Sequence, residues 1–135
     1  MLLSAVVFDF DGVIADSEPL HYELFRRVLA GEGVTLDKGE YYARYLGYDD
    51  AGAFRAVLGD HGRRFTDGDI TRLVAAKIAL FPQLLAGDSV IYPGAAECIA
   101  RLGAEVPLAI ASGAALDDIE AVLSGTKLRT SANKR

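Results

Sequence analysis

The protein has 135 residues, of which 51% are hydrophobic, with a formal net charge of -5 and a pI of about 4.9. This length suits one ordinary domain or a small domain with an insertion, and the hydrophobic content excludes general disorder. The acidic balance argues against a general nucleic-acid-binding protein, although a local site can still bind a small anion.

The N-terminal stretch MLLSAVVFDFDG resembles neither a secretory signal nor a membrane anchor. It lacks a basic segment and reaches Asp9 after only a short apolar run. No apolar run approaches the ~20 residues that a membrane helix needs. The single cysteine, Cys98, excludes an intramolecular disulfide framework. We therefore expect a cytoplasmic protein that binds neither nucleic acid nor a membrane.

The first predicted element is a strand in LLSAVVFDF, a run rich in valine and phenylalanine. Its continuous apolar character predicts burial on both faces, as in a parallel sheet. After the break at DGVIADS, Ser17 or Glu18 can cap a helix that has Pro19 in its first turn. Gly31 and Gly33 are expected to end this helix. Its apolar stripe consists of Leu20, Leu24, Phe25, Val28 and Leu29.

Residues 35–86 are expected to be entirely helical. DKGEYYARYL is short and amphipathic, and DDAGAFRAVLGDHG begins at acidic residues and ends in glycine. Thr66 to Asp69 (TDGD) resembles a capping box, with aspartate in place of the usual glutamate at the fourth position. Lys77 lies on the apolar stripe of the helix that follows, where we expect it to reach solvent from the helix edge. The stripe consists of Ile70, Leu73, Val74, Phe81 and Leu84.

The pattern changes after Gly87. YPGAAECIARLGA predicts a helix, VPLAIASG a second buried strand that ends in small residues, and ALDDIEAVL another helix. Asp117 and Asp118 are interpreted as acids of the first turn that complement the helix dipole. Strand, helix, strand and helix alternate, which predicts a parallel α/β sheet with a helical block inserted after the first strand.

Polar residues follow both predicted strands. Residues two apart in a strand project to the same side, so Asp9 and Asp11 should point together while Phe10 points the opposite way. Ligands of parallel α/β sheets bind at the carboxyl ends of the strands. The second predicted strand ends at Ser112 and Gly113. If the two strands are parallel, both motifs lie at one edge of the sheet and form a site.

These residue types suit phosphoryl transfer. Two close carboxylates repel each other unless a cation or a proton separates them, and their oxygens suit a hard cation such as magnesium. One carboxylate can attack phosphorus and form an aspartyl phosphate, while the other protonates the leaving oxygen and later deprotonates water. Gly12 allows a sharp backbone turn. Free N–H groups after Asp9, with the hydroxyl of Ser112 and the N–H of Gly113, can hold phosphoryl oxygens.

The same residues also have simpler interpretations. A lone D-x-D-G can be a solvated turn or an incidental cation site, and Ser-Gly can be an ordinary strand-to-helix turn. An EF-hand loop is disfavoured because Gly12 comes too early and a strand precedes the motif. His21 is expected on a helix surface or edge, and His61 in a loop.

VVFDFDGVIADSEPLH resembles the first motif of the haloacid dehalogenase-like (HAD) superfamily, in its phosphatase and β-phosphoglucomutase-like branch. YPGAAECIARL followed by LAIASG is similar to that family's approach to its second motif. The resemblance covers roughly residues 4–125. It implies a partial HAD-like (Rossmannoid) parallel-sheet core with an inserted all-helical cap. The domains it implies are a core at 1–14 and 85–125, a cap at 15–84 and an atypical basic tail at 126–135.

The resemblance implies a role for each matching residue of the two motifs. Asp9 would be the nucleophile and a Mg²⁺ ligand, and Asp11 the general acid/base with its backbone carbonyl on the metal. Gly12 would permit the phosphate loop, and Ser112 with Gly113 would bind the transferring phosphoryl group.

Substrate contacts are less closely defined by the resemblance. Glu18 and His21 lie in DSEPLH near the cap hinge and are candidate substrate-binding residues. YLGYDD, Tyr45 to Asp50, matches the cap loop that faces the substrate.

The resemblance implies a magnesium-dependent phosphatase that hydrolyses a small phosphorylated metabolite through an aspartyl phosphate. Asp11 favours phosphoryl transfer over carbon–halogen hydrolysis, because true haloacid dehalogenases lack this aspartate. The alternatives are a β-phosphoglucomutase-like mutase and a non-catalytic fragment that self-associates through exposed strand edges. Neither Lys127 nor Lys134 is assigned to the family's later lysine motif, and no acidic pair follows Glu120. We therefore expect a chain truncated after the second motif.

Overall fold

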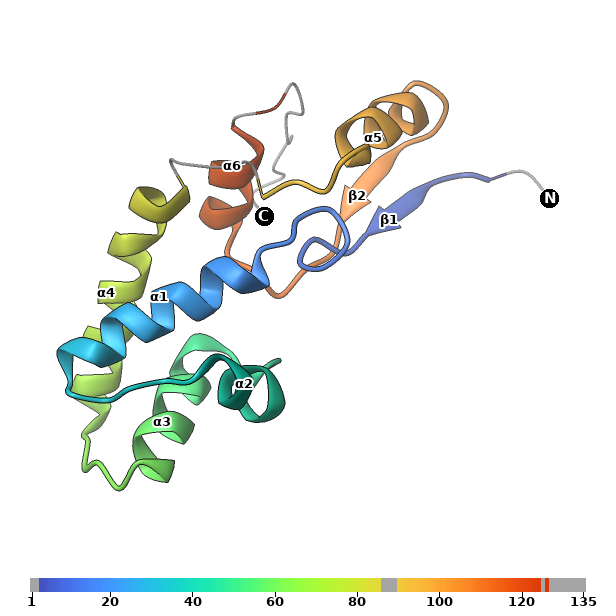
Figure 1. The fold of residues 1–135 in the computed structure, drawn as a ribbon. Coiled ribbons are helices and arrows are strands. Elements are labelled where there is room, and N and C mark those ends of the chain that lie inside the picture. Colours follow the sequence, from blue (N-terminus) through green and yellow to red (C-terminus); the bar gives the residue numbers. More distant parts are fainter. Residues whose placement is uncertain (1–2, 86–89, 125, 127–135) are drawn as a thin grey trace. The chain divides into compact units, whose positions relative to one another are not determined.

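The computed structural model describes residues 3–85, 90–124 and 126. The chain forms two compact units, one from Met1–Glu18 with Gly87–Arg135 and the other from Pro19–Ala86. The first unit contains a parallel sheet and the second is helical (Figure 1). The predicted α/β class with an inserted helical block is therefore confirmed. The finer domain boundaries, at 14/15 and 84/85, stay predictions, and most of the basic tail lies outside the described residues.

The sheet unit has two strands and two helices among its described residues. Strands β1 and β2 are parallel, and the register pairs Val6 with Leu108 and Phe8 with Ile110. The parallel arrangement was predicted from the alternation of strands and helices. The bounds are β1 (Val6–Phe8), α5 (Ala95–Gly103), β2 (Leu108–Ile110) and α6 (Leu116–Leu123).

The prediction that both strands are buried on both faces is wrong. The Val7 side of β1 is open, with 64% of that residue exposed, and Ala109 of β2 is exposed as well. The reason is that the described sheet has only two strands, so few neighbours cover it. The apolar burial falls instead on the loop after β1, where Phe10 and Ile14 are each 1% exposed.

The helical unit contains every element predicted between residues 35 and 86. Five helical segments are described in this unit, and one of them is a short π-helix, η1. The bounds are α1 (Glu18–Gly31), α2 (Lys38–Glu40), η1 (Tyr41–Tyr45), α3 (Asp50–Asp60) and α4 (Asp67–Leu85). Among the described residues, no helix is long and apolar enough to cross a membrane. The cytoplasmic location stays a prediction.

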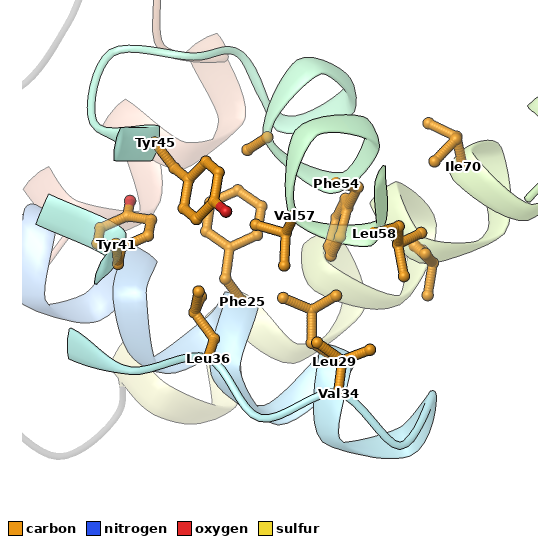
Figure 2. Packing of buried hydrophobic residues seen from close by; sticks show 12 residues of the cluster. Phe25, Leu29, Val34, Leu36, Tyr41, Tyr45, Phe54, Val57, Leu58 and Ile70 are labelled. Carbon is orange, nitrogen blue, oxygen red and sulfur yellow. The ribbon is translucent and has the colours of Figure 1, made fainter. Parts of the chain in front are cut away.

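Aromatic and branched side chains from α1, η1, α3 and α4 form one core in the helical unit (Figure 2). Phe25 lies at its centre, with its ring edge-on to Phe54 at 4.9 Å between centroids and tilted to Tyr41 at 5.7 Å. Such aromatic contacts add to the free energy gained from burying apolar area. Leu29 is fully buried beside them, as the stripe of α1 predicted.

The predicted capping box is present at the start of α4. The N–H of Thr66 donates to Oδ2 of Asp69 across 2.8 Å, and the N–H of Asp69 donates to Oγ1 of Thr66 across 3.2 Å. The first of these hydrogen bonds lowers the pKa of the Asp69 carboxyl. The shorter aspartate therefore takes the place of glutamate in this motif.

Lys77 does not reach solvent, so that prediction is wrong. It is 3% exposed. Its Nζ lies 2.6 Å from Oδ1 of Asp50, 3.1 Å from Nδ1 of His21 and 4.6 Å from the centroid of the Phe25 ring. The carboxylate and the ring face compensate the ammonium charge, which makes burial of this lysine tolerable. Helical spacing alone identified the face of α4 but not these partners.

Candidate functional site

The carboxyl ends of β1 and β2 lie at the same edge of the sheet. The N–H of Ala111 donates to the carbonyl of Phe8 across 2.9 Å, which continues the parallel ladder beyond both strands. Asp9 follows β1 directly, and Ser112 comes two residues after the end of β2. The sheet edge therefore brings together two motifs that are about a hundred residues apart in the sequence, as expected for a parallel pair.

The alternation of more exposed and more buried side chains continues past the end of β1. Asp9 is exposed, Phe10 is buried and Asp11 is half-buried. Oδ1 of Asp9 accepts the N–H of Phe10 across 2.6 Å. Gly12 has φ of +75°, and a side chain placed there would meet no atom within 4 Å. The positive φ, which residues other than glycine rarely adopt, explains why glycine occupies this turn. Crowding does not explain it.

The loop after Asp9 uses most of its own amides. The carbonyl of Phe10 accepts the N–H groups of Val13, Ile14 and Ala15, and the N–H of Gly12 donates to the carbonyl of Ala15 across 2.8 Å. The prediction of free N–H groups that hold phosphoryl oxygens is therefore wrong for these four amides. They stabilise a compact turn instead.

Asp11 has a buried partner that the sequence did not indicate. The hydroxyl of Ser17 donates to Oδ1 of Asp11 across 2.5 Å, and Ser17 is 2% exposed. From the sequence, Ser17 was a candidate helix cap. No spacing rule connects two residues six apart across a turn, so only the folded loop could identify this contact.

The backbone that carries Ser17 is attached to the segment before α5. The N–H of Asp16 donates to the carbonyl of Val90 across 2.7 Å, and the N–H of Tyr92 donates to the carbonyl of Ile14 across 3.0 Å. Partial burial, together with the nearby carboxylate of Asp16 and a hydrogen bond to it, raises the pKa of the Tyr92 hydroxyl. These contacts hold the end of the loop in place.

Ser112 shapes the turn that leads toward α6. Its Oγ accepts the N–H of Ala114 across 3.1 Å, and a hydroxyl that accepts one hydrogen bond still has its own proton to donate. A side chain on Gly113 would meet nothing within 4 Å, so space is open beside this backbone. The first-turn position of Asp117 and Asp118 in α6 is confirmed.

The donors at this edge are oxygen atoms, the kind that magnesium prefers. Asp9 and Asp11 offer carboxylate oxygens and a backbone carbonyl. In the described ranges, no group of three or more histidine, cysteine, aspartate or glutamate side chains could hold a metal. Magnesium is often bound by one or two carboxylates, with water and phosphate oxygens completing its octahedron. The same donors are a poor match for zinc, which prefers nitrogen and sulfur ligands.

The other predicted site residues belong to α1 and to the loop before α3. Glu18 begins α1, and His21 lies one turn later with its Nδ1 close to Lys77. In the loop, Leu46 and Tyr48 are 50% and 55% exposed. Their contact with a substrate stays a prediction.

Known proteins resemble this chain along most of its length. A family model described as haloacid dehalogenase-like hydrolase matches residues 3–130. Protein CbbY of Rhodobacter capsulatus is 30% identical over 133 residues, covering 93% of this chain and 57% of that protein. Protein CbbY of Cereibacter sphaeroides is 32% identical over 130 residues, covering 90% and 54% respectively.

Solved structures of similar proteins also match this chain. CbbY from Rhodobacter sphaeroides in complex with phosphate matches with a TM-score of 0.74 at 26% identity, over 90% of this chain and 56% of that one. A variant of the same protein, in complex with xylulose-(1,5)bisphosphate, gives the same values. The chain therefore spans about half the length of the relatives and solved structures that it matches.

Proposed function

Since the chain belongs to the haloacid dehalogenase-like hydrolases, we propose that the protein is a magnesium-dependent phosphatase of a small phosphomonoester. The observation that carries this proposal is the convergence of Asp9, Asp11 and Ser112 at one edge of the parallel sheet. Two carboxylates and a hydroxyl at strand ends can serve as nucleophile, acid/base and phosphoryl donor in phosphoryl transfer through an aspartyl phosphate.

In the proposed reaction Asp9 is the nucleophile, and Asp11 is first the acid and then the base. A carboxylate oxygen of Asp9 attacks phosphorus, and the bond from phosphorus to the ester oxygen breaks. Asp11 gives its proton to the departing alkoxide, which leaves as an alcohol. Asp11, now ionised, takes a proton from water as the water oxygen attacks phosphorus. The bond to Asp9 breaks, inorganic phosphate leaves, and Asp11 is protonated again.

Magnesium would be held by a carboxylate oxygen of Asp9 and the backbone carbonyl of Asp11. When bound, it neutralises charge on the phosphoryl oxygens and so reduces their repulsion of the attacking carboxylate. Ser112 would donate its hydroxyl proton to a phosphoryl oxygen, and the N–H of Gly113 would do the same. These two donors follow the end of β2, whereas the aspartates follow the end of β1.

The chemistry and the similar proteins support a class of substrate. CbbY from Rhodobacter sphaeroides, which this chain resembles, was solved with phosphate and with a bisphosphate sugar. Those ligands support a small phosphorylated metabolite as substrate here. Glu18 and His21 stay the proposed contacts to the part of the substrate that carries no phosphate.

The test is phosphate release by the purified chain from a panel of small phosphomonoesters, with magnesium or with a chelator. We expect release that requires magnesium and is lost in Asp9→Asn, which keeps the shape of the side chain but removes the nucleophile. Mass spectrometry after a rapid acid quench should find a phosphoryl group on Asp9. Release that persists in the Asp9→Asn variant would refute the proposal. Transfer to a sugar hydroxyl instead of water, seen by product analysis with a hexose 1-phosphate, would replace phosphatase by mutase.

Self-association is a second candidate, and the exposure of β1 favours it. Leu3 and Val7 are 61% and 64% exposed. Within the described part of the chain β1 pairs only with β2, so its other side could pair with a second copy of this chain. Sedimentation of the chain over a range of concentrations tests this. A species that grows with concentration, and that reverts to a monomer in Val7→Lys, is expected. A monomer throughout would exclude it.

A further inference from the structure

We propose that Tyr45 is a positioning residue whose hydroxyl fixes the start of the loop of residues 46–49. Tyr45 ends η1, and its hydroxyl links this short helix to both Glu40 and Asp60. The inference rests on the proposed function for its effect on substrate binding, because the contact of this loop with a substrate is itself a prediction. The position of the loop does not depend on that function and can be measured separately.

The hydroxyl of Tyr45 donates to two carboxylates from different segments of the helical unit. Its Oη lies 2.8 Å from Oδ2 of Asp60 and 3.0 Å from Oε1 of Glu40. Tyr45 is only 2% exposed, so water has little access to take the place of either carboxylate. Burial, together with the hydrogen bonds to Asp60 and Glu40, raises the pKa of the hydroxyl, which therefore keeps its proton. Hydrogen bonds to ionised acceptors are stronger than bonds between neutral groups.

A guanidinium completes this cluster of polar groups. Nη2 of Arg44 lies 2.8 Å from the same Oδ2 of Asp60, and its Nη1 lies 3.7 Å from Oε1 of Glu40. The phenol has one proton for two acceptors, so the positive charge of Arg44 reduces the repulsion between the carboxylates that share it. Glu40 precedes η1 directly, whereas Asp60 is the last residue of α3. The cluster therefore attaches η1 to the helix that begins after the loop.

The backbone of η1 makes this attachment important, because a π-helix is a rare form that occurs mostly as single turns. The N–H of Leu46 donates to the carbonyl of Tyr41 across 3.2 Å, which is the bond between residues five apart that defines this helix. Tyr41 and Tyr45 both pack in the aromatic core of the unit (Figure 2). Burial of a ring is not directional, whereas a hydrogen bond depends on distance and angle. The hydroxyl therefore specifies where η1 ends.

The loop after η1 is held by hydrogen bonds at each end. At its start, the N–H of Tyr48 donates to the carbonyl of Tyr45 across 3.3 Å. At its end, Oδ1 of Asp49 accepts the N–H of Gly52 across 2.7 Å. Between these points, Leu46 and Tyr48 are 50% and 55% exposed. A displacement of Tyr45 therefore moves two large exposed side chains, and it changes the affinity for any ligand that they contact.

The first measurement is amide hydrogen exchange, followed by NMR, of the full chain as the parent, Tyr45→Phe and Tyr22→Phe. Tyr45→Phe removes only the hydroxyl. Tyr22→Phe is the matched control, because the Tyr22 hydroxyl also bonds within the helical unit, to the carbonyl of Leu36 across 3.2 Å. We expect the Leu46 amide to exchange about three- to tenfold faster in Tyr45→Phe, with changed amide shifts at residues 46–49, and neither change in Tyr22→Phe.

Two results of this experiment would overturn the proposal. One is a folded Tyr45→Phe chain whose Leu46 amide exchanges at the rate of the parent. The other is an equal acceleration of the amides in the middle of α1, because that would indicate only a general loss of stability. Circular dichroism of each variant establishes that it is folded.

The second measurement is phosphate release by the same variants. We expect KM to rise by about three- to tenfold in Tyr45→Phe with kcat within about twofold of the parent, since the change affects binding and not the reacting groups. Tyr22→Phe should leave both constants within about twofold. An unchanged KM in Tyr45→Phe would overturn the part that concerns the substrate. If the parent shows no release that depends on Asp9, the proposed function fails, while hydrogen exchange still decides whether Tyr45 positions the loop.

Discussion

The ammonium of Lys77 on α4 lies 2.6 Å from the carboxylate of Asp50 at the start of α3, yet the two side chains differ in exposure, at 4% and 36%. Removing one partner from a buried pair leaves the other charge uncompensated, and that cost depends on whether water can reach it. The pair is therefore asymmetric, because Asp50 can be hydrated when it is alone and Lys77 cannot.

We predict that Asp50→Ala lowers the free energy of unfolding by about 2–3 kcal/mol and that Lys77→Met lowers it by about 1 kcal/mol or less. Urea denaturation followed by circular dichroism measures both. Asp67→Asn is the matched control, because Asp67 pairs with Arg55 while its side chain is 92% exposed, and a change within about 0.5 kcal/mol is expected. A larger loss in Lys77→Met than in Asp50→Ala would contradict this explanation.

The pKa of Glu23 should be low because two arginines on the same helix bind its carboxylate. A hydrogen bond from Arg26 is the main cause of a pKa of about 2, and a second one from Arg27 adds to it. A depressed pKa stabilises the fold above the ordinary value of 4.5, and this contribution disappears as the pH falls toward about 2. NMR titration of the Glu23 carboxyl carbon measures the midpoint.

In Arg26→Gln, the midpoint of Glu23 should move up toward its ordinary value. The contribution to stability is expected to be about 1 kcal/mol or less, because the pair is partly open to solvent. If the titration midpoint of Glu23 in the unmodified protein is near 4.5, these ion pairs do not persist in solution.

The hydroxyl of Thr66 should stabilise the start of α4. Thr66→Val keeps the shape of the side chain but removes the oxygen that accepts the N–H of Asp69, and we expect a loss of about 1 kcal/mol. Thr66→Ser keeps the oxygen and should cost less than about 0.5 kcal/mol. Thermal and urea unfolding of both variants test this pair. Equal stability of the two variants would exclude the capping box as the reason.

Gly12→Ala should destabilise the sheet unit by about 1–2 kcal/mol, the typical cost of an L-residue in the left-handed region. The cost is purely a backbone effect, because an added Cβ would meet nothing within 4 Å at φ of +75°. Gly31→Ala is the control, since it also meets nothing within 4 Å but has no positive φ. We expect that variant to be neutral or slightly stabilising. The two variants are compared by their denaturant unfolding midpoints, which NMR monitors separately for each unit.

The loss of activity in Asp11→Asn should depend strongly on the leaving group of the substrate. With an alkyl phosphate, the first step needs a proton from Asp11, and kcat should fall by about 10²- to 10⁴-fold. With p-nitrophenyl phosphate, the leaving group needs no proton, so the first step survives while hydrolysis of the aspartyl phosphate is slow. A stopped-flow burst of about one nitrophenolate per chain is the expected result. Asp9→Asn should give no burst, and the absence of a burst in Asp11→Asn would contradict the assigned role.

Several elements were predictable because local rules determine them. Apolar residues at helical spacing located α1 and α4, and the TDGD stretch located the start of α4. These patterns depend on neighbours within one or two turns, which the sequence lists directly. The edge where Asp9 and Ser112 converge was also predictable, because consecutive strands joined through helices are parallel.

Burial was the property that local rules predicted badly. Val7 was expected to be covered and is exposed, while Lys77 was expected to be exposed and is covered. Both errors have one cause: the exposure of a side chain depends on which other segments pack against it. For β1 the described sheet supplies only one neighbour, and for Lys77 α3 supplies a carboxylate from 27 residues away.

The sequence by itself determined the class of fold, the parallel direction of the strands and the two carboxylates that follow the first strand. Those features arise from periodicity and from the position of Asp9 and Asp11 after an apolar run. Only the tertiary structure decided that Ser17 holds Asp11, that four amides of the loop bond within it, and that Asp50 neutralises Lys77. Hydrogen bonds of this kind require a donor and an acceptor at a particular distance and angle, and the folded backbone alone establishes both.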